Sequence, residues 1–138
     1  MLTGLKNIKG KKGQALVEMA LILPILLLLV FGMIDFGRIL QTNLAATEAS
    51  REIARVAALL GTDATAATTI ATVQKNATAG ITSGNTVDVT ITPASGARTS
   101  GTEVKVVVAT KVDLITPLIN TMLTDPFPVS ASTTMRAE

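Results

Sequence analysis

A long apolar stretch near the amino terminus sets the strongest constraint on how this chain can fold. Residues 15–34 read ALVEMALILPILLLLVFGMI, close to the ~20 apolar residues that a helix needs to cross a bilayer. The Leu, Ile, Val and Phe residues in this run favour insertion by roughly 4–8 kcal/mol, which exceeds the roughly 2.5–3.5 kcal/mol that Glu18 would cost even at mid-bilayer. The sequence therefore predicts a transmembrane helix over residues 14–37.

The basic residues close to this run lie mainly on its amino side. Arg38 closely follows it, whereas four lysines precede it: Lys6, Lys9, Lys11 and Lys12. Because loops rich in Lys and Arg stay in the cytoplasm, the amino terminus is predicted to be cytoplasmic and the chain after Arg38 to lie outside. We expect a basic leader at 1–13, the membrane helix at 14–37, a helical extension at 38–61 and a small outer domain at 62–138.

A cleaved secretory signal peptide would also begin with basic residues and an apolar segment. However, the run is longer than the ~7–15 apolar residues of such a signal. It also continues into FGMIDFGRIL without a small-x-small cleavage site. The sequence therefore favours a membrane helix that stays attached to the outer domain.

A glycine lies at the cytoplasmic edge of the run, and a glutamate follows it five positions later. These residues are Gly13 and Glu18, in the stretch GQALVE behind the lysines. The pattern resembles the type IV prepilin signal, which a membrane-embedded prepilin peptidase cuts after the glycine on the cytoplasmic side. The resemblance implies cleavage between Gly13 and Gln14, which would make Glu18 the fifth residue of the mature chain.

Two stretches of the amino-terminal region, up to about residue 60, extend this pattern: GQALVEMALILPILLLLVFGMIDFGRIL and the following TEASREIARVAAL. Together they resemble the TadE-like family of Tad (Flp) pilus assembly proteins. The carboxyl-terminal half resembles the family mainly in element order and in a final strand containing SASTTMR. Major Flp pilins usually have Glu-Tyr where this chain has Glu18-Met19, and they are shorter. Both departures favour a minor pilin or pseudopilin.

Two interpretations of Glu18 remain at this point. The carboxylate could simply lie close enough to the membrane interface to stay hydrated. Alternatively, it could pair with a cationic amine in a low-dielectric environment, which stabilises a buried carboxylate. The resemblance implies the second role, because in type IV pilin-like filaments the corresponding Glu is thought to meet the amino terminus of a neighbouring subunit, here Gln14.

Asp35 and Arg38 lie where the membrane run ends, three residues apart and on the same side of a helix. Their spacing predicts an ion pair. It would mark the membrane boundary, while contact with a partner helix is the alternative.

The helical extension carries a narrow apolar seam. Four residues repeat every seven positions, which is typical of helix packing: Ile39, Ala46, Ile53 and Leu60. The opposite face is polar and is expected to be in water: Gln41, Glu48, Arg51, Glu52 and Arg55.

The remaining chain predicts an α+β fold. The first helix should run from about Gln14 to Leu60, with a kink or local unwinding at Pro24, and stop at Gly61. A second helix is predicted over 64–79, capped by Thr62 or Asp63. Period-two alternation predicts strands around 87–92, over 103–112 and over 129–136, with a loop and a short helical turn over 113–123. A small antiparallel sheet packed on the long helix is the economical arrangement.

Composition argues against several functional classes. The chain has no Cys, His, Trp or Tyr, and therefore lacks the commonest general base, the commonest metal ligand and the usual base-stacking side chains. Four of its 12 basic residues are leader lysines, so the chain beyond the leader has 8 basic and 10 acidic residues and a formal charge of −2. We predict no catalytic residues, no metal or cofactor, and no nucleic-acid partner.

These features predict a non-enzymatic minor pilin or pseudopilin of a Tad-like system in a bacterial inner membrane. The resemblance implies prepilin peptidase, other pilins and pilus assembly proteins as partners, with the lipid bilayer around the helix and homo- or hetero-oligomers formed through it. Incorporation into a surface pilus, secretion and cell adhesion are the associated processes. The alternative is an uncleaved, membrane-anchored envelope protein whose outer domain binds another envelope component.

Overall fold

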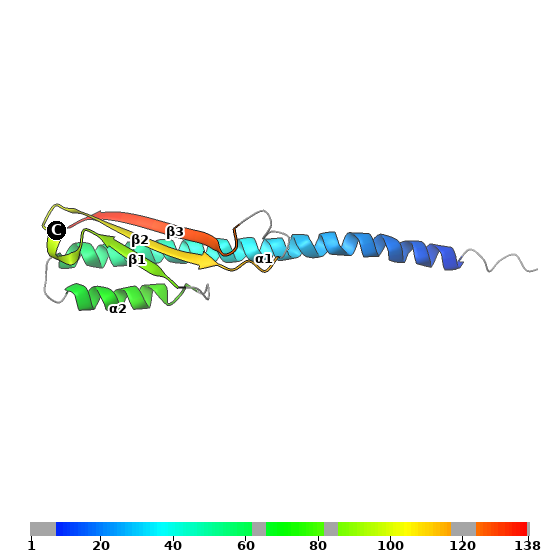
Figure 1. Cartoon of the computed structure of the whole chain (residues 1–138), viewed down its shortest axis with the longest axis horizontal. Coiled ribbons are helices and arrows are strands. Elements are labelled where there is room, and N and C mark those ends of the chain that lie inside the picture. Colours follow the sequence, from blue (N-terminus) through cyan, green and yellow to red (C-terminus); the bar gives the residue numbers. More distant parts are fainter. Residues whose placement is uncertain (1–7, 62–65, 82–85, 117–123, 138) are drawn as a thin grey trace, which may run out of the picture.

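The computed structural model describes residues 8–61, 66–81, 86–116 and 124–137. Two α-helices, one short 3-10 helix and three strands follow one another within these ranges (Figure 1): α1 (Ile8–Leu60), α2 (Ala66–Thr78), β1 (Asp88–Thr92), η1 (Ser95–Ala97), β2 (Glu103–Val112) and β3 (Phe127–Arg136). The predicted α+β fold is confirmed.

Helix α1 is the axis of the molecule. Its carboxyl-terminal half is covered by the sheet on one side and by α2 on another, while its amino-terminal half projects alone (Figure 1). The helix begins at Ile8, earlier than the predicted start at Gln14, because lysine is a good helix former and extends the strong helix that follows. It ends at Leu60, directly before Gly61, whose φ of +48° is the left-handed conformation that glycine adopts most easily.

The predicted local unwinding at Pro24 does not occur, since α1 continues through this residue. A proline removes one backbone donor and disturbs the turn before it. The neighbouring hydrogen bonds of a long helix can span that single interruption, so the helix remains continuous.

The sheet is antiparallel with the strand order β1-β2-β3. Strand β2 has the predicted bounds, because its alternating valines give a clear period of two. Strand β3 starts at Phe127, two residues before the predicted Val129. The difference arises at Pro128: a proline is tolerated here because β3 is an edge strand.

The core lies between α1 and the inner face of the sheet. Valines 104, 106 and 108 of β2 are fully buried, and small residues of α1 allow the strands to approach closely. The buried α1 residues in this cluster are Ala46, Ala49, Ile53, Ala54 and Ala57. Ser50 also joins α1 to the sheet through a 2.7 Å hydrogen bond between its hydroxyl and that of Thr133.

Helix α2 packs against α1 through Ile70, which is 5% exposed, with Val73 and Ala77 half-buried beside it. It ends at Thr78, just before the predicted stop at Gly80. The predicted caps Thr62 and Asp63 lie outside the described residues. The helical turn predicted within 113–123 falls largely on 117–123, which also lie outside them; residues 113–116 are neither helix nor strand.

Candidate functional site

The projecting half of α1 exposes its apolar side chains all round. From Gly13 to Phe31 every residue is exposed, including Leu16 at 71% and Ile25 at 69%. An apolar helix that its own domain leaves uncovered needs another apolar environment, because such a large exposed patch is unfavourable in water. Among the described residues, one helical segment, Gly13–Leu60, is long and apolar enough to cross a membrane. The chain therefore has the features of a membrane-anchored protein.

The predicted processing residues lie on this projecting segment. Gly13, Gln14 and Glu18 are all exposed on α1. A Cβ built on Gly13 would meet no atom within 4 Å, so packing within the chain does not require glycine there. Glu18 has no ion-pair partner among the side chains that the structure describes, which on α1 begin at Gly13. All three residues thus remain exposed within the described part of the chain.

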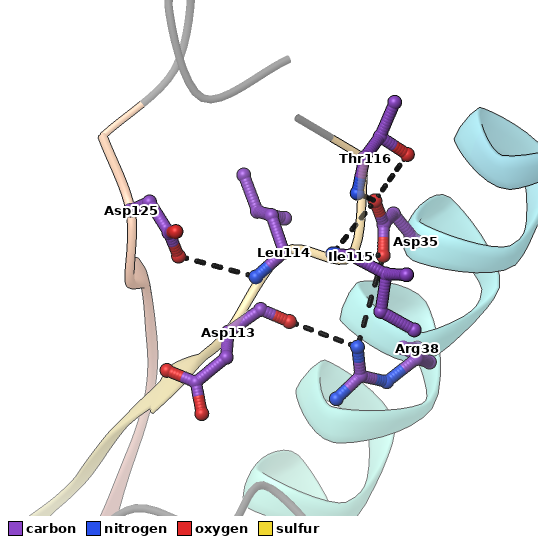
Figure 2. Close-up of polar contacts among 7 residues, drawn as sticks. All are labelled: Asp35, Arg38, Asp113, Leu114, Ile115, Thr116 and Asp125. Carbon is purple, nitrogen blue, oxygen red and sulfur yellow. Dashed lines mark hydrogen bonds and ion pairs between the residues drawn. The ribbon is translucent and has the colours of Figure 1, made fainter. Parts of the chain in front are cut away.

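Asp35 occupies a different environment, because it is 2% exposed and holds the chain segment that follows β2 (Figure 2). Its Oδ1 accepts a hydrogen bond from the backbone N–H of Ile115 at 3.0 Å. Its Oδ2 accepts from the backbone N–H of Thr116 at 2.9 Å and from the Thr116 hydroxyl at 2.6 Å. One carboxylate at the end of the apolar run therefore fixes the outer domain to the helix.

Arg38 reinforces the same junction. One of its guanidinium nitrogens, Nη1, lies 3.7 Å from Asp35 Oδ1 and donates a 2.8 Å hydrogen bond to the carbonyl oxygen of Asp113 (Figure 2). On the far side of the segment, Asp125 accepts a 3.1 Å hydrogen bond from the backbone N–H of Leu114. The Asp35–Arg38 ion pair, whose residues are close in the sequence, is thus part of a larger junction built by α1 and the residues after β2.

Sequence patterns contain no signal for this junction beyond the Asp35–Arg38 spacing. Its other members lie at least 75 residues after Arg38 along the chain. They are Asp113, Leu114, Ile115, Thr116 and Asp125. Backbone groups carry most of the contacts, and a backbone group leaves no trace in a residue pattern.

The predicted seam lies along the covered half of α1. Ala46 is fully buried and Ile53 is 1% exposed, whereas Ile39 and Leu60 at its two ends are half-buried. The buried face is wider than a heptad seam, because it contacts β2, β3 and α2 together. The five polar residues predicted on the opposite face are all exposed.

Arg98 is a buried cation that sequence reasoning missed. It is 4% exposed, and its Nε donates a 2.9 Å hydrogen bond to the carbonyl oxygen of Pro93. Burial disfavours the charged form and lowers the pKa of this guanidinium below its usual value. Its position after η1 makes it a structural element of the β1–β2 connection. No group of three potential metal-ligating side chains occurs among the described residues.

Comparison with known families finds a similarity that lies within α1. The model of the TadE-like protein family matches residues 13–55. Residues 13–55 are similar to this family. The TadE-like segment starts at the glycine of the predicted cleavage site and ends within the buried part of α1, two residues after Ile53, so it includes both the exposed anchor and the junction residues Asp35 and Arg38. The resemblance predicted from the sequence is confirmed over this range.

The TadE-like match suggests involvement in a Tad pilus system. No curated protein matches the chain, and no solved structure matches it.

Proposed function

We propose that this chain is a minor pilin or pseudopilin of a Tad/Flp-type system that prepilin peptidase cleaves between Gly13 and Gln14. The observation that carries the proposal is the TadE-like match beginning at Gly13, on a helix whose apolar surface the rest of the chain leaves bare. Such a helix can exchange lipid for the helices of neighbouring subunits without any rearrangement of the outer domain.

Gly13 supports the cleavage step. A glycine within a helix costs roughly 1 kcal/mol relative to alanine, and no neighbouring atom lies close enough to exclude a larger residue at Gly13. Its presence is therefore better explained by an external partner that needs a close approach to the backbone. Since Gly13 is helical in the uncut chain, the peptidase would have to unwind this turn before cutting.

Glu18 supports the assembly step. Its carboxylate is exposed on the projecting helix and has no ion pair within the described parts of the chain. Cleavage would create an α-amine at Gln14, and an ammonium group from a neighbouring subunit would offset the cost of holding this carboxylate in an apolar environment. In this proposal Glu18 joins subunits through their amino-terminal helices.

The topology follows from the charges around the span. The leader and its lysines lie in the cytoplasm, and the sheet and α2 lie outside the inner membrane. A reporter enzyme that is active only outside the cytoplasm should therefore be active when it is fused after Glu138. Activity of a cytoplasmic reporter at the same position would contradict this orientation.

Mass spectrometry of the chain tests the proposed processing. The protein is expressed in matched hosts with and without an active Tad-type prepilin peptidase, and the intact mass is measured. A chain beginning at Gln14 only in the peptidase host supports the proposal. A leader that remains attached in both hosts would favour the uncleaved envelope protein instead.

A further inference from the structure

The segment Asp113–Thr116 is irregular, yet side chains bond several of its backbone polar groups (Figure 2). Four backbone polar groups are bonded in this way: the Asp113 carbonyl by Arg38 at 2.8 Å, the Leu114 N–H by Asp125 at 3.1 Å, and the Ile115 and Thr116 N–H groups by Asp35 at 3.0 and 2.9 Å. Irregular backbone on a protein surface can be solvated by water. Here the chain itself supplies the partners.

The side chains of the segment differ in exposure, and its apolar residue Ile115 faces outward. Leu114 and Thr116 are buried, at 8% and 2% exposed, whereas the apolar side chain of Ile115 is 54% exposed. The segment thus presents an apolar side chain outward while the N–H groups of Ile115 and Thr116 are bonded to the buried Asp35. This combination suits a place where water is scarce, because unsatisfied backbone groups near hydrocarbon cost several kcal/mol each.

The height of the segment along α1 indicates what surrounds it. The N–H of Ile115 lies 3.0 Å from Asp35, which directly follows the last residue of the apolar run, Ile34. Ile115 is therefore level with the end of the membrane helix. Phe36, one residue beyond Asp35, is 67% exposed at the same level.

We propose that Asp113–Thr116 forms a second membrane contact, in which the Ile115 side chain enters the outer interface of the bilayer beside α1. The occupant of this apolar surface is the lipid bilayer, since the surface continues the membrane-spanning helix. The contact fixes the outer domain against the membrane and requires the span, but it is independent of cleavage and of any pilus role.

The absence of tryptophan from the chain allows a direct test. Ile115→Trp introduces a single fluorophore into the full-length protein, which is reconstituted in phosphatidylcholine vesicles with brominated acyl chains. The control is Ser100→Trp, on an exposed residue in the turn before the start of β2, roughly 30 Å from Ile115 by the rise of a ten-residue strand. With bromine placed near the headgroups, the fluorescence of the Ile115→Trp variant should be quenched several-fold more than that of the Ser100→Trp variant. For the Ile115→Trp variant, bromine near the headgroups should also quench more strongly than bromine near the ends of the acyl chains.

Equal, weak quenching of the two variants would overturn the proposal. A second outcome would also overturn it. The Ile115→Trp variant could show blue-shifted emission that brominated lipid does not quench and that disappears when more lipid dilutes the protein. That result would mean that a second copy of the chain, rather than lipid, covers this position. A fluorophore-free version uses Ile115→Cys and Ser100→Cys, since the chain has no cysteine. A membrane-impermeant maleimide should label the Ile115→Cys variant several-fold more slowly than the Ser100→Cys variant in vesicles, and equal rates would contradict the contact.

Discussion

The side chains of Asp35 and Thr116 meet at 2.6 Å although they lie 81 residues apart in the sequence. Asp35 stands at the end of the apolar run and Thr116 lies beyond β2, so this contact ties the anchor to the outer domain. The same carboxylate accepts two backbone N–H groups. Motion of α1 should therefore be transmitted to the sheet through a defined polar junction as well as through the core.

Asp35→Asn should loosen this junction locally. The amide keeps one acceptor but loses the charge, and a hydrogen bond to a charged group contributes roughly 1.5–3 kcal/mol. Amide hydrogen exchange in the peptide containing Ile115 and Thr116 should accelerate roughly ten- to a hundredfold, on the scale of about 1.4 kcal/mol for each tenfold change. Exchange is followed by mass spectrometry in detergent micelles.

The matched control is Asp88→Asn, because Asp88 is an exposed acid at the start of β1. It should change exchange little, as most surface substitutions alter stability by less than about 0.5 kcal/mol. The same acceleration around Ile115 in both variants would remove the special role assigned to Asp35.

The sequence predicted the parts of the fold that depend on local periodicity. The valines of β2 alternate, so both its bounds and its buried face follow from a period of two. The face of α1 containing Ala46 and Ile53 follows in the same way from a period of seven. The partners of Asp35 could not be predicted from periodicity, because the backbone of Ile115 and Thr116 reaches Asp35 only after the sheet has formed.

The ends of helices and strands were predicted less well where two local tendencies compete. Pro128 argues against a strand, yet its edge position removes the conflict and β3 begins at Phe127. Gly13 weakens a helix, yet the lysines around it and the strong helix after it extend α1 back to Ile8. In both cases the neighbouring structure decided the outcome.

Ile53→Asp should destabilise the outer domain far more than Arg51→Asp. Ile53 is 1% exposed within the core, and an unpaired charge in such a place costs several kcal/mol. Arg51 is exposed on the opposite face. Thermal unfolding of the two purified variants in the same detergent provides the comparison. Equal losses of stability would show that the assigned buried face is wrong.

Gly13→Leu should leave the leader attached in a host that contains prepilin peptidase. A leucine side chain obstructs the approach of catalytic groups to the backbone, whereas glycine offers the least obstruction. Gly37→Leu is the matched control, because Gly37 also has no atom within 4 Å of a built Cβ and lies far from the cleavage site. Intact masses report both results. Normal cleavage of the Gly13 variant would argue against recognition of this glycine.

The central claim, that Glu18 joins cleaved subunits, is tested most directly by co-purification. Glu18→Val should insert and be cleaved normally, since it removes a polar group from the membrane segment. Glu48→Val is the matched control, because Glu48 is exposed on α1 beyond the membrane segment. We predict that recovery of the cleaved Glu18 variant with the Tad pilus machinery falls several-fold while the control stays at the wild-type level. Unchanged recovery of the cleaved Glu18→Val protein would contradict the pairing role.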